Sequence, residues 1–108
     1  MATLPTKLLI DAARTQAQSK GQVMTFLQKG DPDSGQILLV FFDALSRKSR
    51  IARRERDWDT GDYVWMAVKE DALLSTDEVQ QYVDRATKID PDLWVIEIEA
   101  SPAENPFV

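Results

Sequence analysis

The chain has 108 residues, of which 44% are hydrophobic and 29% are charged, and its formal net charge is -5. This length and composition are typical of one globular domain, and no apolar run approaches the roughly 20 residues of a membrane span. Cysteine and histidine are absent, which excludes disulfides, thiol nucleophiles, histidine bases and zinc sites of the Cys/His kind. No signal peptide is recognisable at the N-terminus. We therefore expect a cytoplasmic protein that has no membrane contact and needs no cofactor.

The first predicted element is a helix whose start is ambiguous. The stretch KLLIDAARTQAQSKG fits one helix over residues 6–20, or a short strand at 7–10 followed by a helix at 12–20. Alanines supply a narrow apolar stripe in its second half, and Gly21 is suited to a left-handed stop. Residues 1–6 are expected to fray.

Two strands are predicted next, at 23–29 and 37–42, and the stretch between them has the composition of a turn. This stretch is GDPDSG, in which Pro32 presets a turn backbone angle and the Asp31 side chain can bond to a nearby amide. Gly35 is expected to supply a positive φ before the next strand. We interpret the stretch as a hairpin loop.

The second half of the chain predicts one helix and three strands, the strands at 49–56, 63–68 and 93–99. Ser75 and Glu78 form a capping box directly before an apolar stripe with helical spacing. The residue before a proline disfavours helical backbone, so the helix should end at Asp90. The second Asp-Pro-Asp is then a helix-to-strand connector, and residues 101–108, with two prolines, are expected to fray.

Four segments have a distinctive combined pattern: GDPDSG followed by an apolar strand, Tyr63–Trp65, the capped helix with Tyr82, and IDPDLWVIEIE at 89–99. Together they resemble an alphaproteobacterial family known as domain-of-unknown-function family 1491. The resemblance spans residues 7–100 and implies a strand at 7–10, which periodicity alone does not indicate. It implies an architecture, and it brings no activity, ligand or catalytic residue with it.

The predicted fold class is α+β. We expect a single small domain over residues 1–108, with an ordered core at about 7–100, built as a mainly antiparallel sheet of four to six strands with two helices on one face. Several strands are apolar on both sides, so the second face would stay uncovered and favour self-association. The exposed patch expected there consists of Leu38, Phe42, Val64 and Val95.

Acidic residues are the remaining candidates for a metal or catalytic site. The two Asp-Pro-Asp turns could bring four carboxylates to one hard cation, namely Asp31, Asp33, Asp90 and Asp92. Their spacing matches no EF-hand loop, and local turn chemistry explains both copies, so we predict no metal site. Asp92, Glu97 and Glu99 superficially match a nuclease cluster, but the lysine expected after the second acid is missing. No catalytic residue is predicted.

The segment RKSRIARRER, residues 47–56, holds six basic residues and one acidic residue, so the other 98 residues carry a net charge of -10. In a strand, Arg50, Arg54 and Arg56 would share one face, and Arg53 would lie on the other. Two interpretations stay open: a solvated edge strand protected by charge, or a surface for nucleic acid or an acidic protein. Trp58, between two aspartates, is the candidate contact aromatic. The candidate surface consists of Arg47, Lys48, Arg50, Arg53, Arg54, Arg56 and Trp58.

The leading hypothesis is a small non-catalytic binding or interaction module that forms a homo-oligomer or binds a protein partner. The alternative is a nucleic-acid-binding module that uses the basic segment, which the negative net charge disfavours. A third hypothesis is a metal-dependent hydrolase that works with carboxylates.

Overall fold

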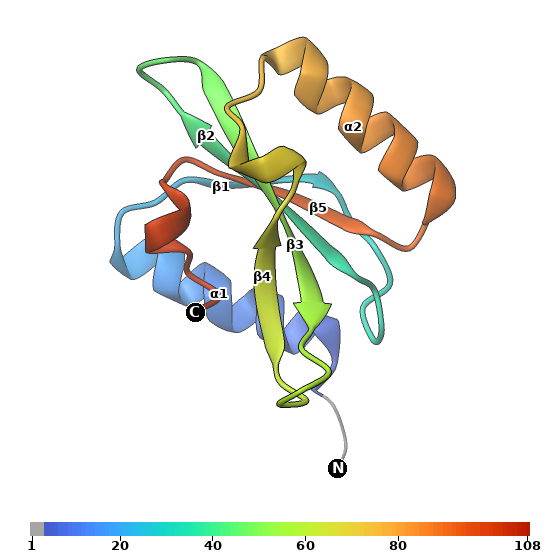
Figure 1. Ribbon diagram of the computed structural model, residues 1–108. Coiled ribbons are helices and arrows are strands. Elements are labelled where there is room, and N and C mark those ends of the chain that lie inside the picture. Colours follow the sequence, from blue (N-terminus) through green and yellow to red (C-terminus); the bar gives the residue numbers. More distant parts are fainter. Residues whose placement is uncertain (1–3) are drawn as a thin grey trace.

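Five β-strands form one sheet with a helix on each face, as the computed structural model of residues 4–108 shows (Figure 1). The elements in chain order are α1 (Thr6–Ser19), β1 (Met24–Gln28), β2 (Ile37–Asp43), β3 (Lys48–Arg56), β4 (Tyr63–Ala67), the 3-10 turn η1 (Lys69–Asp71), α2 (Thr76–Ile89), β5 (Trp94–Ile98) and the 3-10 turn η2 (Pro102–Glu104). The sheet order is β1-β5-β2-β3-β4, with β2 and β5 parallel and the other neighbours antiparallel. The predicted α+β class and mainly antiparallel sheet are confirmed.

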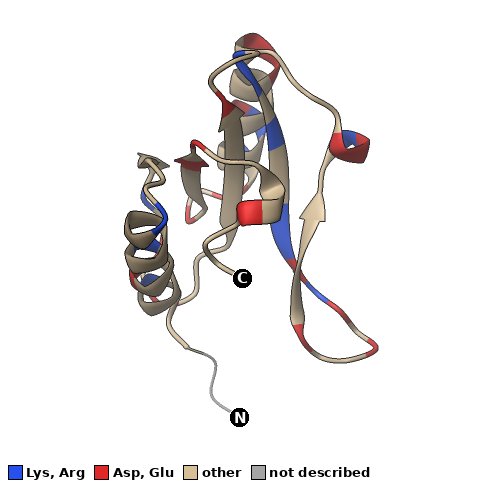
Figure 2. Cartoon of the chain, turned by 90° about the vertical axis from the view of Figure 1, so that its left-hand side faces the viewer, with Lys and Arg blue, Asp and Glu red and all other residues tan. Residues whose placement is uncertain are grey.

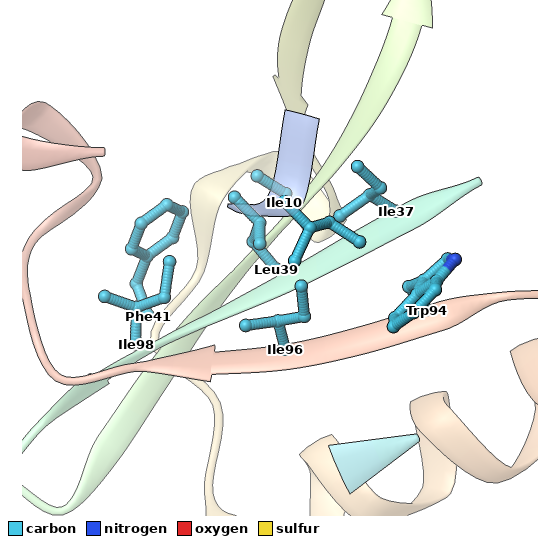
Figure 3. Packing of buried hydrophobic residues seen from close by; sticks show 8 residues of the cluster. Ile10, Ile37, Leu39, Phe41, Trp94, Ile96 and Ile98 are labelled. Atoms are coloured by element: carbon cyan, nitrogen blue, oxygen red, sulfur yellow. The ribbon is translucent and has the colours of Figure 1, made fainter. Parts of the chain in front are cut away.

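The two helices cover opposite faces of the sheet, so the prediction of two helices on one face is wrong. On what we call the first face, Ile10 of α1 packs with Leu39 and Ile96 in the cluster shown in Figure 3. On the second face, Val79 of α2 packs against a cluster that includes Val95. The reason is that β2 and β5 are apolar and buried on both sides, and a sheet of this kind needs a layer on each face.

The exposed patch expected on an uncovered face is therefore absent. Leu38 and Val95 are buried in the cluster against which α2 packs, and Phe42 and Val64 are partly buried. Any self-association of this chain needs a surface other than the one that the apolar strands suggested.

Residues 30–35 do not form the predicted hairpin loop, because β5 lies between β1 and β2. The loop instead contacts the second Asp-Pro-Asp turn. The Asp31 N–H donates to the Asp92 carbonyl oxygen at 3.0 Å, and the Trp94 Nε1–H donates to the Asp31 carbonyl oxygen at 2.7 Å. We call these two segments, residues 30–35 and 90–94, the Asp-Pro-Asp clasp.

Glycine is needed in the clasp because two backbones approach closely there. A Cβ on Gly30 would lie 2.1 Å from the Asp92 carbonyl oxygen, and a Cβ on Gly35 would lie 2.6 Å from the same atom. Both distances are far inside van der Waals contact, so a side chain at either position would push the segments apart. The prediction of a positive φ at Gly35 is wrong, since the glycines with positive φ are Gly21 and Gly61.

The clasp also supports the start of α1. The Thr6 N–H donates to the Asp33 carbonyl oxygen at 3.1 Å, and the Lys7 N–H donates to the Pro32 carbonyl oxygen at 2.8 Å. These bonds satisfy two of the amides that a helix start leaves free, and no side chain of α1 caps them. The single helix is one of the two alternatives that the sequence left open, and the strand implied at 7–10 is wrong.

Helix α2 begins through its own side chains, as the capping box predicts. The Glu78 N–H donates to Ser75 Oγ at 3.2 Å, and the Ser75 N–H donates to Glu78 Oε1 at 3.1 Å. The bonds from the Ser75 backbone and then its side chain hold the pKa of Glu78 below its ordinary value. The helix ends at Ile89, one residue before Asp90, in agreement with the proline rule.

The C-terminal segment packs on the first face, whereas its prolines led us to expect fraying. Asn105 and Pro106 are buried, and the Phe107 ring lies with its centroid 5.3 Å from that of Trp65. Burial of an aromatic ring against the sheet offsets the lack of regular structure. The fraying predicted for residues 1–6 falls in part on residues 1–3, which lie outside the described residues.

Candidate interaction surface

The β3–β4 hairpin, residues 48–67, is the part of the sheet that the helices cover least. It forms one side of the sheet, and its turn extends beyond both helices (Figure 1). The hairpin contains most of the basic residues singled out in the sequence, and it is followed by η1 and then by α2. The candidate surface therefore lies on this hairpin.

The six basic residues do not gather into one patch. In β3, Ala52 belongs to the first-face cluster and Ile51 to the second-face cluster, so alternation places Arg50, Arg54 and Arg56 on the first face. Arg53 lies on the second face, exposed. Lys48 begins the strand, about 27 Å from its other end, and Arg47 lies in the preceding turn with a φ of 58°.

Three of these side chains already have partners. The Arg50 Nε–H donates to the Asp71 carbonyl oxygen at 3.1 Å and lies 3.3 Å from Asp71 Oδ1. The Arg54 guanidinium carbon lies 3.9 Å from the Tyr63 ring centroid, and that of Arg56 lies 5.6 Å from the same ring. Burial lowers the pKa of Arg54, although the neighbouring Tyr63 opposes this shift. Stacked guanidinium groups of this kind are partly engaged by the protein itself.

Acidic residues lie at both ends of the basic strand. Figure 2 shows the red tip of the hairpin at one end of β3, and η1, mostly red, beside the other half of the strand. The tip contributes Asp57, Asp59 and Asp62, and η1 contributes Glu70 and Asp71. These carboxylates reduce the positive potential that a polyanion would meet along the strand.

The edge of the sheet is β4, so the interpretation of the basic segment as an edge strand is wrong. β3 pairs with β2 on one side and with β4 on the other. In the ladder between β3 and β4, the Val68 N–H donates to the Ile51 carbonyl oxygen, and the Asp57 N–H donates to the Asp62 carbonyl oxygen. Asp62 and Val68 therefore direct their backbone groups toward β3, and so does every second residue between them. By alternation, the N–H and C=O groups of Tyr63, Trp65 and Ala67 point away from β3. Within residues 4–108, no strand pairs with this edge.

The open edge carries no charged side chain. β4 reads Tyr63-Val64-Trp65-Met66-Ala67, and its exposed members include Tyr63 at 41% and Met66 at 49% of full exposure. Natural proteins usually protect such an edge with charges, prolines or bulges. This unprotected edge is the feature that the sequence analysis missed, because it depends on the order of strands, which local patterns do not encode.

Trp58 is exposed, as expected for a residue in a polar turn. It has 86% of full exposure and lines an open cavity of about 460 Å³ on the hairpin. The other lining residues are Glu55, Arg56, Asp57, Asp59, Val64 and Met66. The structure thus brings Trp58 together with Arg56 and with the apolar side chains of β4, and it separates Trp58 from the rest of the basic residues.

The carboxylates of the two Asp-Pro-Asp turns serve local turns. The Asp31 carboxylate accepts from the Ser34 N–H at 2.8 Å and from the Ser34 hydroxyl at 2.9 Å, and these bonds lower the pKa of Asp31. The Asp90 carboxylate accepts from the Asp92 N–H at 3.1 Å. No group of three or more acidic side chains suited to a metal ion occurs within residues 4–108.

The fold and the surface define a class of protein: a small α+β domain, clasped at one side of its sheet and open at a hairpin on the other. No helix within residues 4–108 is long and apolar enough to cross a membrane. The chain belongs to the family described as protein of unknown function DUF1491, whose model matches residues 4–108. This match confirms the resemblance seen in the sequence.

Solved structures support the family and the fold. The chain is similar to the crystal structure of a DUF1491 family protein from Caulobacter crescentus, with 28% identity, a TM-score of 0.83, and coverage of 98% of this chain and 95% of the other. An NMR structure of a DUF1491 family protein from the same organism gives 28% identity, a TM-score of 0.79, and coverage of 100% and 94%. Protein Atu0922 from A. tumefaciens, at 17% identity, shares the fold with a TM-score of 0.78 and coverage of 97% and 92%. No curated protein matches the chain.

Proposed function

We propose that this protein is a small non-catalytic interaction module that self-associates by pairing the β4 edges of two copies. The observation that carries the proposal is the open, uncharged edge of β4. Backbone donors and acceptors on such an edge favour the addition of another strand. The bacterial relatives support a bacterial protein, and we keep the expected cytoplasmic location as part of the proposal.

The sequence of β4 fits an antiparallel pair of identical strands. With the two-fold axis at Trp65, Val64 of one copy would face Met66 of the other, and Tyr63 would face Ala67. Every cross-strand pair is then uncharged, and the aromatic and branched members are those that stabilise antiparallel pairs. A two-fold contact of this kind also closes on itself and does not grow into a filament.

The other edge of the sheet is less suited to this role. β1 has a register shift between Phe26 and Gln28, which interrupts regular pairing along the strand. This irregularity is a protective feature that β4 lacks. We therefore assign the contact to β4.

Sedimentation velocity over a concentration series tests the proposal with a matched pair of variants. Met66 on β4 and Leu27 on β1 are both 49% exposed, so that a lysine at either position should leave the fold intact. We expect the parent to shift from monomer to dimer between about 10 μM and about 1 mM. Met66→Lys should remain monomeric, and Leu27→Lys should behave as the parent. A parent that stays monomeric, or equal loss in both variants, contradicts the proposal.

Salt separates this proposal from the nucleic-acid alternative, which the neighbouring Trp58 and Arg56 favour. Each copy carries a charge of -5, so screening between about 50 mM and about 500 mM salt should strengthen self-association. Nucleic-acid binding would weaken instead, with a log–log slope of about -0.9 per phosphate contact on duplex DNA. Anisotropy with single-stranded RNA and duplex DNA should show affinity no tighter than roughly 10 μM at physiological salt. Submicromolar affinity that Arg54→Ser and Arg56→Ser abolish would favour the alternative.

A further inference from the structure

A separate cavity lies on the first face, between the C-terminal segment and the β3–β4 hairpin. Its volume is about 280 Å³, and its walls include Phe41, Arg50, Trp65, Asp71, Asn105 and Val108. Aromatic and aliphatic groups thus surround a few polar ones. This combination is typical of sites for small molecules, which use apolar walls for affinity and a few polar groups for orientation.

Asn105 supplies an unused hydrogen-bond donor to this cavity. Its side chain accepts the Phe107 N–H through Oδ1 at 2.9 Å, which leaves Nδ2 as the remaining polar atom. The residue is only 6% exposed, and no acceptor among residues 4–108 bonds Nδ2. Within residues 4–108, the fully buried side-chain atom that lacks a partner is Gln22 Oε1, so Nδ2 keeps some exposure to solvent. Asn105 is one of the residues that line the cavity, where a ligand acceptor could satisfy Nδ2.

Another part of the wall contains an ion pair and an unusual turn. Lys69, Glu70 and Asp71 in η1 have φ values of 52°, 57° and 60°, a left-handed conformation that L-residues rarely adopt in succession. The turn holds the Asp71 carboxylate 3.3 Å from Arg50 Nε. The two charges offset each other, so the wall presents no net charge to a ligand. Backbone strain of this kind is concentrated at functional sites such as ligand clamps.

We propose that this cavity binds a small uncharged molecule that has an aromatic or apolar body and a carbonyl oxygen. The Asn105 Nδ2–H would donate to the carbonyl oxygen. Trp65 and Phe41 would contact the body of the ligand. The neutral Arg50–Asp71 pair gives no reason for the ligand to carry a charge. This inference goes beyond the proposed self-association, since it concerns the first face of the hairpin and not the β4 edge.

The sequence offers a direct probe of the cavity, because Asn105 is its only asparagine. Protein labelled with ¹⁵N in asparagine alone gives a single side-chain amide pair, which can be followed during titration with phenylacetamide. We expect a saturable shift of this pair with a dissociation constant of about 1 mM or tighter. Phenylacetate, which has the same shape and a negative charge, should shift it at least tenfold more weakly. No saturable shift, or tighter binding of phenylacetate, would overturn the proposal.

Variants of the cavity residues show where phenylacetamide binds. Their affinity is measured by calorimetry, because the asparagine amide signal is lost when Asn105 is replaced. Asn105→Asp keeps the oxygen that accepts the Phe107 N–H and replaces the donor by an anion, so phenylacetamide binding should fall at least tenfold. Ala67→Leu places a larger side chain in the cavity wall and should have the same effect without touching Asn105. Arg53→Gln, on the other face of β3, is the control and should bind as the parent does. Unchanged affinity in Ala67→Leu, or equal loss in Arg53→Gln, contradicts the assignment even if Asn105→Asp unfolds.

Discussion

The two sides of the sheet are held in different ways. Around β1, β5 and β2, the Asp-Pro-Asp clasp joins backbone to backbone with no room for a Cβ at Gly30 or Gly35. At β4, the hairpin is paired on one side only, and long side chains around it are exposed. Of the four segments that carry the family resemblance, GDPDSG and the start of IDPDLWVIEIE form the clasp, and Tyr63–Trp65 lies in the hairpin. The Asp-Pro-Asp segments therefore maintain the fold, and the proposed function is based on the hairpin.

A pair of glycine substitutions tests this comparison with the largest expected effect. Gly30→Ala would place a Cβ 2.1 Å from the Asp92 carbonyl oxygen, so we expect a loss of more than about 3 kcal/mol in unfolding free energy. In the hairpin turn, a Cβ on Gly61 would meet no atom within 4 Å. Gly61→Ala should therefore lower the unfolding free energy by only about 1 kcal/mol, because alanine is disfavoured at the φ of 79°. Urea unfolding measures both. Equal costs would mean that the clasp is no more tightly packed than the turn.

The starts of the two helices differ in the same way, and the expected effect on stability is smaller. Because α2 begins through its own side chains and α1 through clasp carbonyls, Ser75→Ala should cost about 1 kcal/mol, as expected for loss of a helix cap. Ser101→Ala is the control, since Ser101 precedes η2 without a side-chain cap bond. Denaturant midpoints compare the two variants, and a larger loss for Ser101→Ala would contradict the role of the capping box.

Local chemistry explains what could be predicted from the sequence. The capping box at Ser75 and the end of the first helix at Gly21 depend on residues within a few positions of each other, so the sequence alone predicts both. The alternation of Arg50, Arg53 and Arg54 between the faces follows from strand geometry alone. The α+β class follows from the same local elements.

Long-range pairing explains what could not be predicted. The insertion of β5 between β1 and β2 turns an apparent hairpin loop into the clasp, and no residue of GDPDSG records that Asp92 will lie beside it. The same pairing makes β4 the edge and places the helices on opposite faces. The Asn105 cavity was missed because the two prolines of the C-terminal segment suggested fraying, whereas burial of Phe107 against Trp65 holds the segment in place.

The capping box should also give a small, signed dependence of stability on pH. The pKa of Glu78 is lowered in the folded state, so its contribution is full above the ordinary value of 4.5 and is lost as pH falls through the lower folded value. Glu78→Gln keeps a capping side chain but cannot titrate, so it should lose less stability than the parent between about pH 5 and pH 3. Urea midpoints at each pH measure this. Glu99→Gln is the control, because Glu99 is exposed and lies outside the capping box. If this variant reduced the pH dependence of stability as much as Glu78→Gln does, the change in net charge would be the cause and the capping box would not.

The smallest effect is expected from the clasp carboxylates, because the clasp depends on backbone atoms. Asp33 uses its carbonyl oxygen to accept the Thr6 N–H, so Asp33→Asn should change the unfolding free energy by less than about 0.5 kcal/mol. Millimolar Mg²⁺ or Ca²⁺ should leave the melting temperature unchanged, whereas a ligand at a hundred times its Kd would add about 2.7 kcal/mol. Differential scanning fluorimetry measures both changes. A rise of several degrees with either cation that Asp33→Asn removes would show that the clasp binds a metal ion. The clasp would then have a function besides stabilising the fold, and the contrast drawn between the clasp and the hairpin would be wrong.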